Sequence, residues 1–292
     1  MSCVKSHSRG DLMEYSEIIV DRPRERVQRI TLNNPEKRNP ITNEMRTEIF
    51  HALEAADLDD SIRVTVIRGA GKCFSSGYNL KAGVQGANEQ NQPFYTAGGL
   101  GNWARHLVEG GFKMWDMAKP IIAQIHGYCI AGATELALAC DLVYVADDAI
   151  IGYPIVRNGT PPNVQFYPWL MGMRDAMEMM LTGDSISGAE AAQTQFANRA
   201  YPADELEDAV LNMAERVAKV PSDVQQFNKR AVHAQMEEMG IRSGLRKGTE
   251  LHTLARFTET CVAMQEAVRA DFGGALAKRD AAFGDYEKKS KN

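Results

Sequence analysis

Two stretches of the sequence decide the fold, Gly71-Lys-Cys-Phe-Ser-Ser-Gly-Tyr-Asn-Leu-Lys81 and His126-Gly-Tyr-Cys-Ile-Ala-Gly-Ala-Thr-Glu135. Each follows an apolar run typical of a buried strand, and each turns the chain on glycine. The rhythm of strand, glycine turn, helix and strand predicts a parallel α/β sheet with crossover helices. The two turns should therefore meet at the carboxyl end of adjacent strands, where such sheets bind their ligands.

The glycines in these turns place backbone donors at that edge. Gly132 is expected in the first turn of a helix, where its N–H has no partner and lies at the positive end of the helix dipole. Gly77 permits a turn that presents the N–H of Tyr78. Two such donors on one carbonyl oxygen would stabilise an enolate or a tetrahedral anion. The alternative is that the glycines only allow tight packing between strand and helix.

Glu135 lies one turn inside the same predicted helix. Its carboxylate should therefore lie near the carbon next to a bound carbonyl, where it can act as a general base or acid. The alternative is a first-turn glutamate that merely satisfies the helix dipole.

Composition limits the class of protein. The 292 residues suffice for one large α/β core, and no apolar run approaches the length of a bilayer span. Because the first dozen residues lack the apolar core of a secretory signal, we expect a cytoplasmic location and no membrane partner. The net charge of -5, with mixed signs, argues against nucleic acid as a partner. Five cysteines without a C-x-x-C pair argue against a disulfide frame or a metal site.

The first half of the chain predicts a hairpin of strands at 17–20 and 27–32, a proline-containing loop at 33–40 and a helix capped by Thr42. A mobile segment over the site is expected at 82–104, followed by a helix from about 103 to 117. Strands are expected at 64–67, 121–125 and 142–146.

Beyond Tyr167 the chain is predicted to be helical throughout. Ser187-Gly-Ala-Glu190 has the spacing of a capping box. Another helix should open at Ser222, with Val224, Phe227 and Ala231 facing inward. Residues 259–278 are expected to dock on the core or on a neighbouring subunit.

These ordered motifs resemble the enoyl-CoA hydratase/isomerase (crotonase) superfamily from about Ile30 to the C-terminus. Asn33-Asn-Pro-Glu-Lys-Arg-Asn resembles its early loop, the two glycine stretches resemble its oxyanion segments, and Ala275-Leu-Ala-Lys-Arg-Asp resembles its final helix. The resemblance implies a spiral of ββα units over 14–205 that holds the active site, and a C-terminal helical region over 206–292. That second region would serve trimerisation and form part of the CoA site.

The resemblance also implies a substrate, an assembly and site residues. The substrate would be an acyl-CoA thioester with no separate cofactor, and the assembly a homotrimer or a dimer of trimers. The oxyanion amides map onto Tyr78 and Gly132, with Glu135 as acid/base. The implied contacts to substrate and CoA are Lys37, Arg38, Tyr78, Asn79, Leu80, Lys81, Gly132 and, from an adjacent subunit, Lys278.

The chain departs from the family pattern at one catalytic position. Hydratases of the family carry a second glutamate after a Gly-x-Pro step, and here that position holds Ile155, which cannot transfer a proton. Tyr78 is also far bulkier than the usual alanine, and Asn79 stands where many relatives have aspartate. Candidates to replace the second carboxylate, by proximity to pocket segments, are Tyr95, Arg105, His106, Tyr153 and Arg157.

Four functions follow from these residues. The leading hypothesis is a hydratase or dehydratase that uses Glu135. The second is an isomerase, or a hydrolase of a thioester or ring ketone, because one proton shuttle suffices for isomerisation. The third is a catalytically weak CoA-binding subunit, and the fourth is a serine protease that uses Ser75 or Ser76, neither of which heads a helix beside a recognisable triad.

Overall fold

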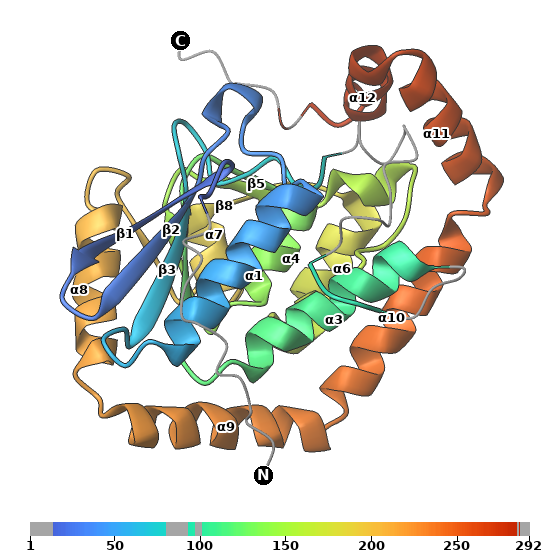
Figure 1. The fold of residues 1–292 in the computed structure, drawn as a ribbon. Coiled ribbons are helices and arrows are strands. Elements are labelled where there is room, and N and C mark those ends of the chain that lie inside the picture. Colours follow the sequence, from blue (N-terminus) through green and yellow to red (C-terminus); the bar gives the residue numbers. More distant parts are fainter. Residues whose placement is uncertain (1–13, 80–92, 97–100, 285, 287–292) are drawn as a thin grey trace.

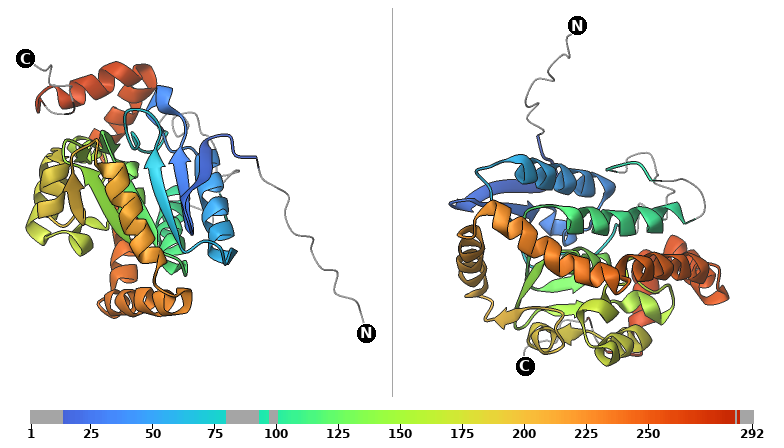
Figure 2. Two further views of the ribbon diagram at one scale, coloured as in Figure 1. Left: turned by 90° about the vertical axis from the view of Figure 1, so that its left-hand side faces the viewer. Right: turned by 90° about the horizontal axis from the view of Figure 1, so that it is seen from below.

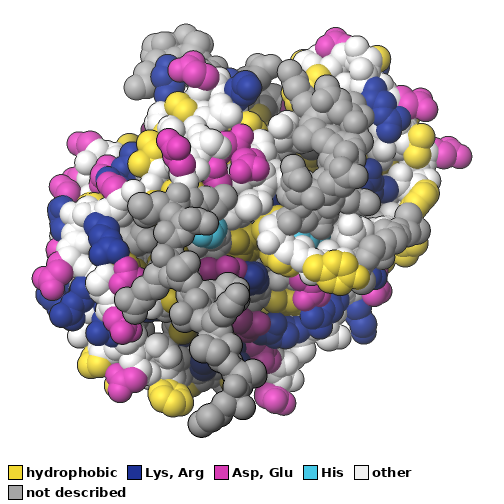
Figure 3. Space-filling view, viewed as in Figure 1, with side chains coloured by type: hydrophobic (Ala, Val, Ile, Leu, Met, Phe, Trp, Pro, Cys, Tyr) yellow, Lys and Arg dark blue, Asp and Glu magenta, His cyan; other side chains and the backbone are white. Residues whose placement is uncertain are grey.

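The computed structural model describes residues 14–79, 93–96, 101–284 and 286 (Figure 1). Most of the segment predicted to be mobile, 82–104, lies outside the described residues. On the face shown in Figure 3, basic and acidic side chains alternate over the described surface. Within the described ranges, none of the helices combines the length and apolar character needed to cross a bilayer.

The strands form two sheets. Their bounds are β1 (Ile18–Arg24), β2 (Val27–Leu32), β3 (Val64–Gly69), β4 (Ile121–Ile125), β5 (Tyr128–Ile130), β6 (Leu142–Ala146), β7 (Ile150–Gly152), β8 (Ile186–Ser187) and β9 (Arg199–Tyr201). The larger sheet has the order β1-β2-β3-β4-β6-β9, in which β1 is antiparallel to β2 and the other neighbours are parallel. The smaller sheet has the order β5-β7-β8. From β4 onward the chain passes back and forth between the two sheets.

Helices cover both faces of the larger sheet. Helix α1 packs on β1 and β2, while α8 packs on β3, β4 and β6 (Figures 1 and 2). The helices and 3-10 turns are η1 (Pro35–Lys37), α1 (Asn43–Leu58), α3 (Asn102–Asp116), α4 (Gly132–Leu138), η3 (Pro154–Arg157), α5 (Tyr167–Leu170), α6 (Met173–Thr182), α7 (Gly188–Gln193), α8 (Leu206–Ala218), α9 (Ser222–Glu238), α10 (Ile241–Ala255), α11 (Glu259–Ala270) and α12 (Phe272–Asp280).

Local signals predict most of the first half of the fold, although they do not predict strands β5 and β7. The hairpin, the three buried strands and the helices at α1, α3 and α4 are confirmed. Thr42 accepts the backbone N–H of Met45 at 2.9 Å and so caps α1. The capping box of Ser187 and Glu190 is likewise present at the start of α7.

The prediction of an entirely helical second half is wrong. Strands β8 and β9 interrupt the helices, and β9 completes the larger sheet by pairing with β6. These strands have two and three residues, too few to show a two-residue period. Pairing with neighbouring strands, and not local sequence, determines them.

The predicted inner face of α9 is also wrong. Phe227 is 78% exposed, whereas Gln225, Lys229 and His233 are buried. The Lys229 ammonium donates to Asp141 at 2.9 Å, and the His233 ring stacks on Trp115. Hydrogen bonds and stacking thus bury the polar face of the helix, and the apolar face is left at the surface of the chain.

Asn39 joins the early loop to the first glycine turn. Its side chain is fully buried, and its amide lies 2.9 Å from the carbonyl oxygen of Ala70 and 3.0 Å from that of Cys73. Its amide oxygen accepts the N–H of Asn34 at 2.9 Å. Buried backbone groups left without a partner are costly, so this one side chain holds the loop and the turn together.

We predict that Asn39→Ala lowers the free energy of unfolding by roughly 2 to 4 kcal/mol, because buried carbonyls and a backbone N–H lose their partner. Urea unfolding at fixed protein concentration measures this change. Glu36→Ala, an exposed change in the same loop, should stay within about 0.5 kcal/mol of the parent. Equal stability of both variants would contradict the assigned role of Asn39.

Candidate active site

The two glycine turns lie against each other. Gly77 has a φ of 91°, and a Cβ built on it would lie 2.5 Å from the carbonyl oxygen of Ile130 and 3.0 Å from the nitrogen of Gly132. A side chain at this position would therefore separate the turns. The sequence prediction that the turns meet at one edge of the sheet agrees with this geometry.

The backbone N–H groups of Tyr78 and Gly132, the two expected donors, take no part in the hydrogen bonds of the strands and helix around them. Ile41 pairs with this turn through the Gly77 carbonyl at 2.8 Å and the Asn79 N–H at 3.0 Å, so the N–H of Tyr78 points away from it. Gly132 is the first residue of α4, and its N–H has no acceptor within the helix. Within the described chain, neither N–H forms a hydrogen bond.

Hydrogen bonds to residues before and outside α4 fix the position of its first turn. Thr134 donates both its N–H, at 2.9 Å, and its hydroxyl, at 2.6 Å, to the carbonyl of Ala131. The Thr134 hydroxyl also bonds to that of the buried Tyr167. Ala131 itself adopts a left-handed φ of 53°, and its N–H bonds to Gly152 of β7 at 2.9 Å. These contacts fix the orientation of the N-terminal turn.

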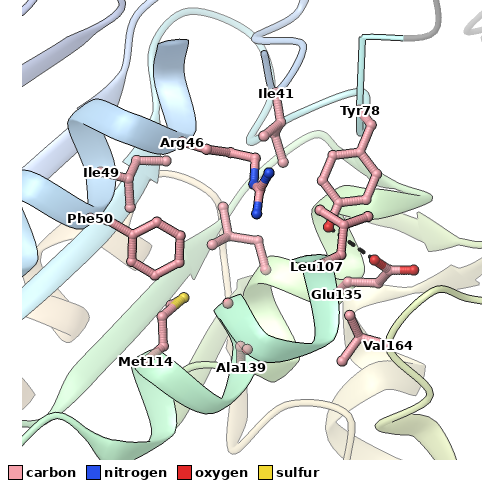
Figure 4. Close-up of a pocket in the computed structure, with 13 residues that line it drawn as sticks. Ile41, Arg46, Ile49, Phe50, Tyr78, Leu107, Met114, Glu135, Ala139 and Val164 are labelled. Carbon is pink, nitrogen blue, oxygen red and sulfur yellow. Dashed lines mark hydrogen bonds between the residues drawn. The ribbon is translucent and has the colours of Figure 1, made fainter. Parts of the chain in front are cut away.

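Glu135 is a buried carboxylate with donors from three separate segments. Its side chain accepts the Tyr78 hydroxyl at 3.0 Å (Figure 4). It also accepts the Asn163 N–H at 2.7 Å and the Tyr153 hydroxyl at 3.3 Å. Burial raises its pKa to about 7, and the hydrogen bonds from Tyr78 and Asn163 oppose that rise. The group can therefore gain or lose a proton near neutral pH.

The Tyr78 side chain folds into the site. Its ring lies directly on Gly132, where an added Cβ would approach a ring carbon to 2.3 Å. Burial, and then the charge of Glu135, raise the pKa of the Tyr78 phenol well above its usual value, so it remains a donor. From the sequence, Tyr78 was predicted to supply an oxyanion N–H and a contact to CoA, and the role of its hydroxyl was not predicted.

A cavity of about 40 Å³ adjoins these groups between α1, α3 and α4. Most of its walls are apolar, and two charged side chains, Arg46 and Glu135, line it (Figure 4). Arg46 extends from α1 into the space between Phe50 and Tyr78. The apolar lining is formed by Ile41, Ile49, Phe50, Leu107, Met114, Leu136, Ala139 and Val164.

The residues expected to bind CoA lie in two places. Lys37 and Arg38 are exposed in the early loop, and the Arg38 carbonyl accepts the N–H of Ser76, so this loop adjoins the Tyr78 segment. Asn79 follows Tyr78 directly, whereas Leu80 and Lys81 lie outside the described residues. Lys278 is exposed on α12.

Ile155, at the substituted glutamate position, lies in η3 and does not line the cavity. Of the five candidate substitutes, Tyr153 reaches Glu135. Arg157 instead forms ion pairs with Asp184 and Asp280. His106 is buried against Thr96 and Phe94, and burial lowers its pKa to about 3. Tyr95 and Arg105 line a separate surface depression.

Ser75 has a structural role. Its hydroxyl donates to the carbonyl of Asn39 at 2.6 Å and accepts the N–H of Gly77 at 3.1 Å. Because both bonds are buried and local, they give no support to the serine protease hypothesis. Among the residues that the structure describes, no group of three or more His, Cys, Asp or Glu side chains could hold a metal ion.

Helix α10 supports the loop that binds Glu135. The Thr249 hydroxyl donates to the carbonyl of Asn163 at 2.7 Å, and the His252 ring bonds to the carbonyl of Pro161 at 2.7 Å. The sequence analysis missed both Asn163 and Arg46. Asn163 donates its backbone N–H at 2.7 Å and its side-chain amide at 3.4 Å to Glu135, contacts that depend on loop geometry. Arg46 interrupts an apolar helix face beside Met45 and Ile49, a signal that the sequence does contain.

Comparison with known proteins agrees with this architecture. Residues 22–268 match the protein family described as enoyl-CoA hydratase/isomerase. The chain is 31% identical to a putative enoyl-CoA hydratase of Mycobacterium tuberculosis, over 78% of this chain and 77% of that protein. It is also 31% identical to the 2,3-dehydroadipyl-CoA hydratase of Escherichia coli, over 84% and 92%.

Solved structures give the same result. A crystal structure of an enoyl-CoA hydratase/isomerase from Xanthobacter autotrophicus superimposes with a TM-score of 0.83 at 32% identity, covering 92% of this chain and 99% of that one. An enoyl-CoA hydratase from Mycobacterium smegmatis superimposes with a TM-score of 0.84 at 28% identity, covering 96% and 98%. The chain belongs to the enoyl-CoA hydratase/isomerase family.

Proposed function

We propose that the protein is an enzyme acting on acyl-CoA thioesters, of hydratase or dehydratase type. The thioester oxygen would accept the N–H groups of Tyr78 and Gly132, and Glu135 would act as the acid/base. The observation that carries the proposal is the buried Glu135 carboxylate, with a pKa of about 7, one helical turn from the unpartnered N–H of Gly132. A glutamate that only stabilised the helix dipole could do so from an exposed position, without being buried beside a cavity.

A single carboxylate can complete the hydration. Ionised Glu135 takes a proton from water as the water oxygen attacks the β-carbon of the enoyl thioester. The electrons of the double bond move onto the thioester oxygen, where two N–H groups stabilise the enolate. Glu135 then returns its proton to the α-carbon. The hydroxyls of Tyr78 and Tyr153 hold the carboxylate in place through both transfers.

Isomerisation is the second candidate, and the cavity lining favours it. Among the described residues around the cavity, Glu135 is the single carboxylate, because Ile155 occupies the other position and lies elsewhere. An enzyme that moves a double bond needs only to take a proton from one carbon and return it to another. The same N–H groups would stabilise the same enolate, so the two reactions differ only in whether water enters.

Substrate binding and assembly complete the proposal. The exposed Lys37 and Arg38 are suitably placed to bind phosphate groups of CoA, and no separate cofactor is required. The C-terminal helices would form a trimer or a dimer of trimers in the cytoplasm, placing Lys278 beside a neighbour's site. Large apolar side chains exposed on these helices support this assembly; they are Phe227, Val232, Leu251 and Leu254.

We predict that Glu135→Gln reduces turnover at least 100-fold, since an amide cannot exchange the proton. Affinity for CoA thioesters should change little, because the N–H groups of Tyr78 and Gly132 remain. Loss of conjugated-thioester absorbance with crotonyl-CoA measures turnover. Product analysis of a β,γ-enoyl-CoA measures isomerisation, and free thiol release measures hydrolysis.

The matched control for this experiment is Glu178→Gln, a change at an exposed position on α6. It should leave both rate and affinity at parental values. Parental turnover in Glu135→Gln would exclude the acid/base role, and absence of all three reactions in the parent would favour a CoA-binding subunit.

We predict that kcat/KM rises with pH and is half-maximal near pH 7, because the ionised form of Glu135 is the base and its pKa is about 7. Tyr78→Phe removes a donor that lowers this pKa, so the midpoint should move to higher pH. Measuring kcat/KM of both proteins between about pH 5.5 and 9 gives the two midpoints. A rate that falls as pH rises through 7 would contradict the base role.

We predict a solution mass of three or six chains of 32.3 kDa each. The exposed apolar faces of the C-terminal helices would be buried by such an assembly. Light scattering coupled to size exclusion measures the mass. A monomeric mass would contradict the proposed assembly.

A further inference from the structure

Arg46 is a buried cation whose donors have no acceptor. The residue is 6% exposed, and its Nη1 has no hydrogen-bond partner within the described chain. The side chain lies over the face of the Trp103 ring, with 5.3 Å between the guanidinium carbon and the ring centroid. This contact with the ring supplies no acceptor in the plane of the guanidinium, so Nη1 is left unsatisfied.

Burial of such a group is unfavourable unless an acceptor or anion reaches it. Burial lowers the Arg46 pKa to about 10, and attraction from Tyr78 and Glu135 only partly opposes that change. The guanidinium is therefore charged at neutral pH. Arg46 and Glu135 line the same cavity, and among the residues drawn in Figure 4 no hydrogen bond joins them.

The cavity also has space beside this group. Gly110 and Gly111 lie in the middle of α3, where glycine is about 1 kcal/mol less favourable than alanine. A Cβ on Gly110 would lie 3.2 Å from the Phe50 ring and 3.4 Å from Nη2 of Arg46. Glycine at this position therefore lets α3 pack closely against Phe50 and the guanidinium. A volume of about 40 Å³ suits about three water molecules, or a carboxylate with one methylene.

We infer that the acyl group of the substrate is short and carries a second carboxylate, which binds Arg46 at the far end of the cavity from the thioester. The substrate class is thus a monothioester of a dicarboxylic acid. This inference rests on the proposed function, since it places the reacting carbons beside Glu135. The planar carboxylate matches the two-pronged N–H edge of arginine and would satisfy Nη1.

Matched thioesters test the inference. But-2-enoyl-CoA and but-2-enedioyl-CoA differ only in a terminal methyl against a carboxylate, as do hex-2-enoyl-CoA and hex-2-enedioyl-CoA. The parent should prefer the dicarboxylic member of at least one pair by 10- to 100-fold in kcat/KM, the range expected for a charge-assisted hydrogen bond. Arg46→Met should remove this preference, so that the two members of each pair react with similar kcat/KM.

Two controls distinguish binding from folding. Arg46→Met replaces an unpaired buried charge with an apolar side chain of similar length, so its thermal stability should equal or exceed that of the parent. Arg216→Met, at an exposed position on α8, should keep the parental preference. A loss of stability together with equal loss on both substrates would show that Arg46 is structural and would overturn the inference.

Binding of saturated analogues separates this inference from the proposed reaction. Calorimetry with butanoyl-CoA against butanedioyl-CoA, and with hexanoyl-CoA against hexanedioyl-CoA, needs no turnover. Tighter binding of a dicarboxylic member that Arg46→Met abolishes would support the inference even if no enoyl thioester reacts. Equal binding within each pair would overturn it even if hydration is observed, and absence of all binding would overturn both.

Discussion

The site depends on keeping one carboxylate, that of Glu135, buried away from bulk solvent. An isolated buried carboxylate is strongly disfavoured, and the chain meets that constraint with hydrogen bonds from distant segments. Tyr78 follows β3, Tyr153 follows β7, and the Asn163 loop is braced by Thr249 of α10. The packing of the two sheets and the C-terminal helices therefore determines which hydrogen bonds the Glu135 carboxylate receives.

Glycine sets the geometry around this carboxylate. Gly77 lets the first turn approach the nitrogen of Gly132, and Gly132 lets the Tyr78 ring lie on the helix start. The backbone donors and the Tyr78 hydroxyl therefore approach the same small volume from different sides. Arg46 adds a positive charge to the other wall of that volume, so the cavity combines an apolar lining with one group of each sign.

Sequence reasoning predicted the parts of this arrangement that local chemistry determines. Glycine turns, apolar runs and caps such as Thr42 are specified within a few residues, which is why the hairpin, the central strands and the meeting of the two turns could be predicted. Strands β8 and β9 could not, because pairing partners far along the chain define them. The buried face of α9 was missed because an ion pair with Asp141 and a stacked His233 outweigh its apolar pattern. The contacts of Tyr78 and Asn163 with Glu135 depend on loop geometry, which a linear pattern does not contain.

The central claim is that Glu135 exchanges protons near neutral pH because it is buried. Nuclear magnetic resonance of protein labelled with ¹³C at the glutamate carboxyl carbon, compared with Glu135→Gln, measures this property without any substrate. The account predicts one carboxyl signal, missing from the variant, that titrates near pH 7. A Glu135 signal that titrates near its ordinary value of about 4.3 would contradict it.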